Sequence, residues 1–267
     1  MTKIISGFLI LFPFIAVMSC NSNDEAIVKR SQEANTKEDL KNLITQYPDS
    51  LLLVQNLIEK YREDGSYDSA IALTDIEIKK DSGNAYLWNM NATLHFENED
   101  TTAAISSLEH AVNLYPLPEY LIALGTVYAE VKNTKAINIA NGLLKVNRVK
   151  WGKDAMFLKG LYYNYSDDKR KAINYFDSSL QMDFTYMFAY REKAIALYDL
   201  GKYEEALTTL KRAVTIQNNF DEGYYWMGKC YEKLHKPDDA IQSYQNALLY
   251  DKNFIEAREA LERLQSQ

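Results

Sequence analysis

Large apolar and small residues recur with a period of about 34 residues from residue 51 almost to the C-terminus. With Ala85 as position 1, large side chains stand at positions 4, 12 and 24, where the chain has Trp88, Phe96 and Leu108. Small residues and a proline occupy positions 8, 20, 27 and 32, namely Ala92, Ala104, Ala111 and Pro116. This pattern predicts one helix–turn–helix unit per period, whose apolar face is buried only when neighbouring units stack.

The phase of the pattern divides the chain into six units with a capping helix at each end. The predicted units are 51–84, 85–118, 119–152, 153–186, 187–220 and 221–254, and the predicted caps are 37–47 and 255–267. The third unit is irregular: counted from Pro118, which places Gly125 and Tyr128 in phase, Ala136 arrives one residue early, and Asn141-Gly142 falls inside the second helix. We expect that helix to be interrupted there, and therefore shortened or locally distorted. The fold expected over 37–267 is an all-α solenoid with a continuous core.

A unit of this length, with an aromatic residue at position 4, small residues at 8, 20 and 27 and a proline at 32, resembles the tetratricopeptide repeat. The resemblance implies a right-handed solenoid whose first helices line a groove, with positions 2, 5, 9, 12 and 13 facing a protein or peptide ligand. On this chain those positions give the candidate groove residues Tyr86, Asn89, Phe96, Phe157, Asn164, Tyr165, Phe188, Arg191, Tyr198, Tyr225 and Lys229. In the clearly phased units, no lysine at position 5 is combined with asparagine at position 9, which argues against the family's clamp for chaperone C-termini.

The N-terminus carries a second pattern. Lys3 precedes an apolar run from Ile4 to Val17, which ends at Ser19-Cys20 and is too short for a lasting membrane span. It resembles the signal of bacterial lipoproteins, which implies removal of residues 1–19, acylation of Cys20 with chains such as palmitate, and anchoring at a membrane surface. An ordinary secretory signal with an incidental cysteine is the alternative.

Residues 20–36 are polar and lack apolar periodicity, so they predict a flexible tether between the anchor and the repeats. The expected location is the bacterial cell envelope, with the outer membrane favoured over the inner. Asp24 and Glu25 resemble the surface-export signal of some lipoproteins of the Bacteroidota group, but a solvated tether is the favoured explanation for them.

Charge and composition narrow the function. A formal net charge of -7 argues against nucleic acid as a partner. Cys230, the one cysteine besides Cys20, is expected to be a small buried apolar residue. The three histidines have no metal-ligand spacing, and the sequence has neither a glycine-rich phosphate loop nor a Gly-x-Ser-x-Gly elbow. We therefore expect no enzyme activity, no metal and no cofactor.

Two hypotheses of function remain open. The first is a non-enzymatic, lipid-anchored scaffold that holds a protein or peptide in an aromatic groove. The second is a carbohydrate- or nutrient-binding lipoprotein that uses the same aromatic faces for stacking. The first predicts aromatic residues spread along several units, and the second predicts aromatic residues gathered in a small pocket.

Overall fold

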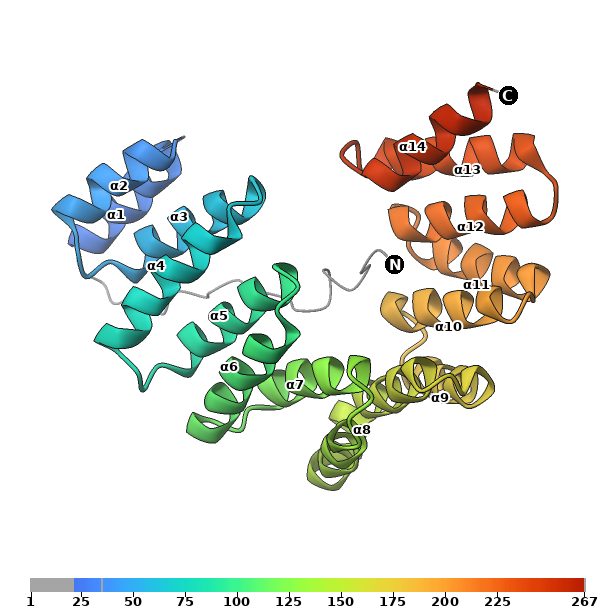
Figure 1. Ribbon diagram of the computed structural model, residues 1–267, viewed down its shortest axis with the longest axis horizontal. Helices are drawn as coiled ribbons and strands as arrows, with labels where there is room; N and C mark the ends of the chain where they lie inside the picture. The colour runs from blue at the N-terminus through green and yellow to red at the C-terminus, as the bar shows by residue number, and fades with distance from the viewer. Residues whose placement is uncertain (1–21, 35, 267) are drawn as a thin grey trace. The chain divides into compact units, whose positions relative to one another are not determined.

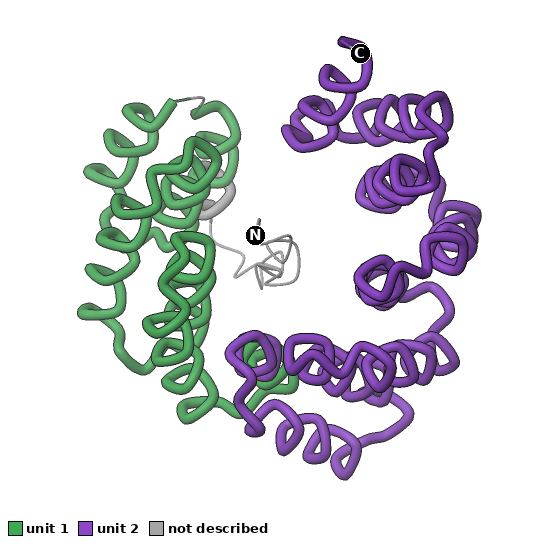
Figure 2. Tube along the Cα trace, turned by 45° about the vertical axis from the view of Figure 1, so that its right-hand side comes forward, with its two compact units in different colours: residues 1–124 green, residues 125–267 purple. Residues whose placement is uncertain are grey.

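The computed structural model describes residues 22–34 and 36–266, in which all the regular secondary structure is α-helical (Figure 1). The chain divides into two compact units, Met1–Leu124 and Gly125–Gln267 (Figure 2). The predicted signal 1–19 and the predicted acylation site Cys20 lie outside the described residues. None of the described helices is both long enough and apolar enough to cross a bilayer.

The helices of unit 1 are α1 (Ser22–Glu33), α2 (Lys37–Gln46), α3 (Leu51–Glu63), α4 (Tyr67–Lys80), α5 (Ala85–Glu97) and α6 (Thr101–Leu114). Each helix from α2 to α5 packs on the next, and α1 packs on α3. Helix α7 (Pro118–Glu130) follows, and the boundary between the units falls within it. Helices α3 and α5 begin at position 1 of the sequence period, and each packs against the helix that follows it.

Unit 2 continues the same arrangement. Its helices are α8 (Lys135–Tyr165), α9 (Lys169–Met182), α10 (Met187–Asp199), α11 (Tyr203–Ile216), α12 (Asp221–Lys233), α13 (Pro237–Tyr250) and α14 (Ile255–Gln265). Each helix from α8 to α14 packs on the next, and α10 also packs on α12, the first helix of the following pair. First helices of successive pairs therefore lie beside one another within this unit.

Small residues at position 8 allow an aromatic ring at position 24 to pack between the two helices of a pair. A Cβ atom on Gly228 would lie 2.5 Å from Cε1 of Tyr244, and one on Gly160 would lie 2.4 Å from Cε1 of Phe176. Both rings are fully buried. The recurring glycine and aromatic residue are thus two halves of one packing contact.

The irregular third repeat differs from the others just after the turn inside its helix pair. A residue with positive φ stands at position 15 of the five other repeats, as at Gly201 (φ 74) and His235 (φ 57). Counted from Pro118, where α7 begins, Lys132 (φ 58) is at position 15 as well. Ala136 follows Lys132 by four residues, whereas the corresponding alanine follows by five in the other repeats, so Ala136 comes one residue early.

The predicted interruption at Asn141-Gly142 is wrong. Helix α8 runs through both residues, and its one non-helical residue is Asn147 (φ -161, ψ 99). Asn141 and Gly142 are exposed while Ala140 and Leu143 are buried, so the helix keeps its packing contacts and loses only helix propensity. The side chain of Asn147 accepts a hydrogen bond from the backbone N–H of Lys150 at 3.0 Å, which caps the helical segment after the bend.

The predicted flexible tether is also wrong over its described part, because Ser22–Glu33 forms α1. Ile27 packs against a cluster that contains Leu40, Leu53 and Leu57, and Ser31 is buried. Few apolar residues suffice to hold this helix, because α3 offers an apolar surface that α2 does not fully cover. Because this segment has few apolar residues, its sequence does not indicate these contacts.

Candidate functional site

The candidate site in unit 2 is the surface of its first helices, namely the part of α8 after Asn147, α10 and α12. These helices carry eight of the predicted groove residues: Phe157, Asn164, Tyr165, Phe188, Arg191, Tyr198, Tyr225 and Lys229. We call this the first-helix surface of unit 2. Direct packing of α10 on both α8 and α12 brings the three helices together.

Arg191 joins two adjacent repeats at the centre of this surface. Its Nη1 donates hydrogen bonds to both carboxylate oxygens of Glu222 on α12, at 2.7 and 2.8 Å, and its Nε donates to Glu192 at 3.0 Å. Only 1% of Arg191 is exposed. Burial alone would lower the pKa of Arg191, but the carboxylates of Glu192 and Glu222 outweigh it and the pKa is raised.

The single positive charge of Arg191 does not balance the two negative charges of Glu192 and Glu222. Burial raises the pKa of Glu222 although Arg191 lowers it, and a smaller contribution from Asp221 raises it further. Burial likewise raises the pKa of Asp221, the first residue of α12. The start of α12 therefore carries carboxylates whose negative charge is incompletely neutralised by the protein.

Phe188 is held beside this ion-pair network. The guanidinium carbon of Arg191 lies 5.4 Å from the centre of the Phe188 ring, within the range of a cation–π contact. The ring also meets Tyr186 edge to face, with centroids 5.9 Å apart. Phe188 is half-buried, so part of a ring whose orientation is fixed remains accessible.

Tyr198 forms a second aromatic group on the same surface. Its ring meets Trp226 at 5.5 Å and Tyr203 at 5.2 Å, both edge to face. Burial raises the pKa of Tyr198 to about 12. The indole N–H of Trp226 is buried without a hydrogen-bond acceptor among the described residues. Lys229, also on α12, is half-buried.

Side chains at repeat position 5 were predicted to line the groove, but the following repeat covers them. Phe157 is 1% exposed and packs against Tyr186 at 5.3 Å, while Tyr225 is buried against Phe254 at 5.0 Å. Tyr186 and Phe254 each directly precede the next first helix. Phe157 and Tyr225 are therefore core residues, not the groove surface that was predicted for them. The aromatic residue just before each first helix is the sequence signal that indicates this burial.

The other predicted residues of unit 2 are divided between core and surface. Asn164 is buried and accepts a hydrogen bond from Nζ of Lys169 at 2.9 Å. Tyr165 is half-buried, and burial, followed by the charges of Glu192 and Glu130, raises its pKa. The accessible members of the first-helix surface are thus Tyr165, Phe188, Tyr198 and Lys229.

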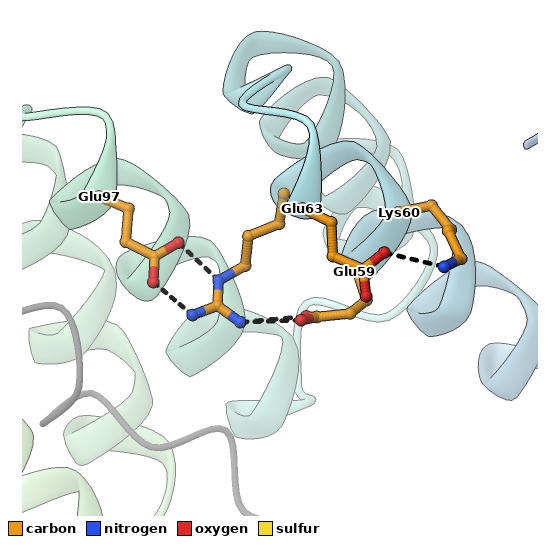
Figure 3. Close-up of polar contacts among 5 residues, drawn as sticks. Glu59, Lys60, Glu63 and Glu97 are labelled. Carbon is orange, nitrogen blue, oxygen red and sulfur yellow. Dashed lines mark hydrogen bonds and ion pairs between the residues drawn. The ribbon is translucent and has the colours of Figure 1, made fainter. Parts of the chain in front are cut away.

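Unit 1 contains a second arginine held by two carboxylates. Arg62 on α3 donates to both oxygens of Glu97 on α5 at 2.6 Å and to Glu59 at 3.0 and 3.2 Å, as the fork of dashed lines in Figure 3 shows. A separate pair joins Lys60 and Glu63 at 2.8 Å. The residues Glu59, Arg62 and Glu97 stand at positions 9, 12 and 13 of their repeats, so the resemblance places all three on the groove side. They were not among the predicted site residues, although opposite charges at these positions could have indicated them.

The predicted residues of unit 1 lie in two environments. Phe96 and Asn89 are buried, and Phe96, 2% exposed, belongs to the core, not to the groove surface predicted for it. Tyr86 is half-buried, and burial, followed by the charges of Tyr120 and Glu59, raises its pKa. A pocket of about 360 Å³ opens beside it, lined by Asp81, Gly83, Asn84, Ala85, Tyr86, Tyr115, Leu117 and Tyr120. Tyr115 is 58% exposed at its mouth.

The described residues contain no group of histidine, cysteine, aspartate and glutamate side chains arranged to hold a metal ion. Cys230 is buried, as the sequence predicted, and burial raises the pKa of its thiol to about 12. At neutral pH the thiol is therefore protonated and unsuited to nucleophilic chemistry.

Comparisons with known proteins agree on the repeat. A model of the TPR repeat matches residues 195–234, and a model of the tetratricopeptide repeat matches residues 221–254. Mouse (Mus musculus) DnaJ homolog subfamily C member 7 is 29% identical over 101 residues, which cover 38% of this chain and 20% of that protein. A TPR repeat-containing protein of Methanocaldococcus jannaschii is 26% identical over 128 residues, 48% of this chain and 37% of the relative. The chain thus spans well under half the length of these relatives.

The fold has a close counterpart among solved structures. The crystal structure of a tetratricopeptide repeat protein from Parabacteroides merdae superposes with a TM-score of 0.70 at 18% identity, over 92% of this chain and all of the other. The likeness confirms the predicted fold class, an all-α solenoid of helix pairs.

Proposed function

Because the chain belongs to the tetratricopeptide repeat family, we propose that it is a non-enzymatic scaffold that binds a protein or peptide on the first-helix surface of unit 2. The observation that carries the proposal is the placement of Phe188 between Arg191 and Tyr186, with the ring still half accessible. An aromatic side chain fixed before binding gives contact area at a small entropic cost. Tyr198, fixed by Trp226 and Tyr203, extends the same surface along α10.

The charges of this surface indicate the chemistry of the partner. Arg191 faces two carboxylates, and Asp221 lies beside Glu222 with its pKa raised by burial. A basic side chain of a bound peptide supplies the missing positive charge. The proposed partner segment therefore combines an apolar side chain for Phe188 or Tyr198 with a lysine or arginine. Its affinity is expected to fall as the salt concentration rises.

Site-specific photocrosslinking tests this function. A photoreactive phenylalanine analogue at Phe188 or Tyr198 is expected to crosslink one and the same protein in cells, identified by mass spectrometry. The matched control is the same analogue at Gln242, an exposed residue on the second helix α13. A partner captured equally well from Gln242, or different proteins from the two test positions, would contradict the proposal.

We further propose that the scaffold is anchored in the bacterial cell envelope through acylated Cys20, with the outer membrane as the favoured site. The support is the sequence of the leader, with Lys3, the apolar run Ile4 to Val17 and Ser19 before the cysteine. Mass spectrometry of the mature N-terminus is expected to find Cys20 first and carrying acyl chains. A mature protein with an unmodified Cys20, or one cleaved elsewhere, would support the ordinary secretory signal instead.

A carbohydrate-binding function is the second candidate, and the tyrosine pocket of unit 1 favours it. Three tyrosines, Tyr86, Tyr115 and Tyr120, line a pocket of about 360 Å³ together with polar Asp81 and Asn84. Aromatic rings beside carboxylate and amide groups suit a ring with hydroxyl substituents. Titration calorimetry with a panel of oligosaccharides tests this candidate, with Tyr115→Ala expected to abolish any binding. Absence of binding by the wild type would exclude it for that panel.

A further inference from the structure

The irregular part of unit 2 has a charge opposite to that of the whole chain. Residues 131–153 contain no aspartate or glutamate, whereas the full sequence has 37 acidic residues against 30 lysines and arginines. The cations of this segment are Lys132, Lys135, Lys145, Arg148, Lys150 and Lys153. The acid-free segment includes the bend of α8 at Asn147.

Three of these cations lie near the bend without an ion pair to a residue that the structure describes, and Lys132 lies in the turn before α8. Lys135 donates to the hydroxyl of Tyr128 at 3.0 Å, and Lys153 pairs with Asp183 at 2.6 Å. By contrast, Lys145, Arg148 and Lys150 are exposed, and none of them forms an ion pair with a residue that the structure describes. We call residues 145–151 the basic bend.

Apolar side chains project from the same bend. Val149 is 98% exposed and Val146 is 73% exposed, whereas Trp151 is half-buried with Nζ of Lys150 at 4.4 Å from its ring. The bend therefore presents two exposed valines, Val146 and Val149, beside a tryptophan and three cations. We call the two valines the apolar tip. Within residues 22–34 and 36–266, no side chain covers either valine to any large extent.

The backbone holds the tip in place. The side chain of Asn147 caps the helical segment that begins after it. Before the bend, Leu143 is buried. After it, Gly152 packs so closely on Met182 that a Cβ atom there would lie 2.6 Å from Sδ. The bend is thus fixed on both sides, and its orientation does not depend on a partner.

We propose that the basic bend docks on an anionic phospholipid bilayer. Exposed aliphatic side chains and a tryptophan enter the headgroup region, while lysine and arginine attract anionic lipid. Exposed side chains need no complementary pocket to enter a bilayer, whereas a protein partner would have to supply one. Nucleic acid would use the cations but would leave the valines in water. The basic bend contains none of the accessible members of the first-helix surface, and its action requires neither the scaffold function nor acylation of Cys20.

Vesicle binding by an unacylated full chain tests the proposal. The chain carries Cys20→Ser in every sample, so that no acyl anchor contributes, and the apolar leader is the same in all variants. Flotation compares vesicles of phosphatidylcholine alone with vesicles of phosphatidylcholine and phosphatidylglycerol in equal parts. The wild-type bend is expected to bind the anionic vesicles at least about tenfold more tightly.

Two triple variants separate the local surface from net charge. Lys145→Glu/Arg148→Glu/Lys150→Glu is expected to remove the preference for anionic vesicles. Lys233→Glu/Lys236→Glu/Lys252→Glu changes the net charge equally at exposed positions of unit 2 and is expected to reduce binding less than about twofold. Equal losses in the two variants would overturn the proposal, because binding would then follow net charge alone.

A third variant tests the apolar tip. Val146→Ser/Val149→Ser is expected to weaken binding to anionic vesicles about tenfold, because two apolar side chains no longer enter the bilayer. Unchanged binding would overturn their proposed role and leave a purely electrostatic contact. Absence of wild-type binding to anionic vesicles, or binding through the same cations to duplex DNA or an acidic protein only, would overturn the docking proposal as a whole. Circular dichroism checks that each variant folds, which is expected since all substituted side chains are exposed.

Discussion

Arg191 on α10 donates two hydrogen bonds to Glu222 on α12, and both residues belong to first helices of successive repeats. The pair joins two neighbouring repeats of unit 2 through a buried ion pair, in addition to their apolar packing. Unit 1 contains a similar ion pair between Arg62 of α3 and Glu97 of α5. In each case one arginine serves two carboxylates, so the linked surface keeps negative charge.

Replacing Arg191 by methionine is expected to lower the free energy of unfolding by about 3–5 kcal/mol, because Glu192 and Glu222 would be left buried without their cation. Urea denaturation followed by circular dichroism measures this loss. Arg263→Met is the matched control, since Arg263 is half exposed and pairs with Glu232 at 2.8 Å. The control is expected to cost about 0–1 kcal/mol. Similar losses in both variants would show that Arg191 contributes no more than a surface ion pair.

Alanine substitutions on the first helices of unit 2 are expected to distinguish core residues, which affect stability, from contact residues, which affect partner binding. Phe157→Ala should cost about 3–5 kcal/mol, because the ring is fully buried against Phe176 and Tyr186. Phe188→Ala should cost much less and should weaken partner crosslinking through Tyr198. Thermal denaturation and crosslinking yield measure the two effects. A large loss of stability from Phe188→Ala would place that residue in the core as well.

Asp183 provides a pH-dependent contribution to stability. Hydrogen bonds from Lys153 and Thr185 lower its pKa from 3.8 to about 2. Because the folded-state pKa lies below the unfolded value, the contribution is complete above pH 4 or so and is lost as the pH falls toward about 2. Asp183→Asn should therefore lower stability by about 1–2 kcal/mol at pH 7 and by progressively less below pH 4 or so. Urea midpoints at several pH values test this, and a difference that does not depend on pH would contradict it.

Two glycines in α8 and α12 are expected to respond in opposite directions to alanine. Gly228→Ala should cost about 1–3 kcal/mol, because the new Cβ would meet the buried ring of Tyr244 at 2.5 Å. Gly142→Ala should add about 1 kcal/mol, since a Cβ there meets no atom within 4 Å and alanine favours the helix. Melting temperatures compare the two variants. Stabilisation by Gly228→Ala would show that Tyr244 can move aside at little cost.

The repeat follows from the amino-acid pattern alone. A regular spacing of large and small residues can be satisfied only when helices pack at short distances, as the contact of Gly228 with Tyr244 shows. The helix starts at Leu51, Ala85, Met187 and Asp221 follow from that spacing. The shorter spacing between Lys132 and the second helix is visible in the sequence as the displaced Ala136.

Which side chains form the surface depends instead on contacts between repeats. Phe157, Arg191 and Tyr225 share repeat position 5, which the family pattern assigns to the groove, yet residues of the next repeat cover all three. The bend at Asn147 and helix α1 likewise depend on contacts with other helices, because their own residues give weak local signals. Local spacing fixes the period of a repeat protein, but exposure depends on atoms that lie one repeat further along the chain.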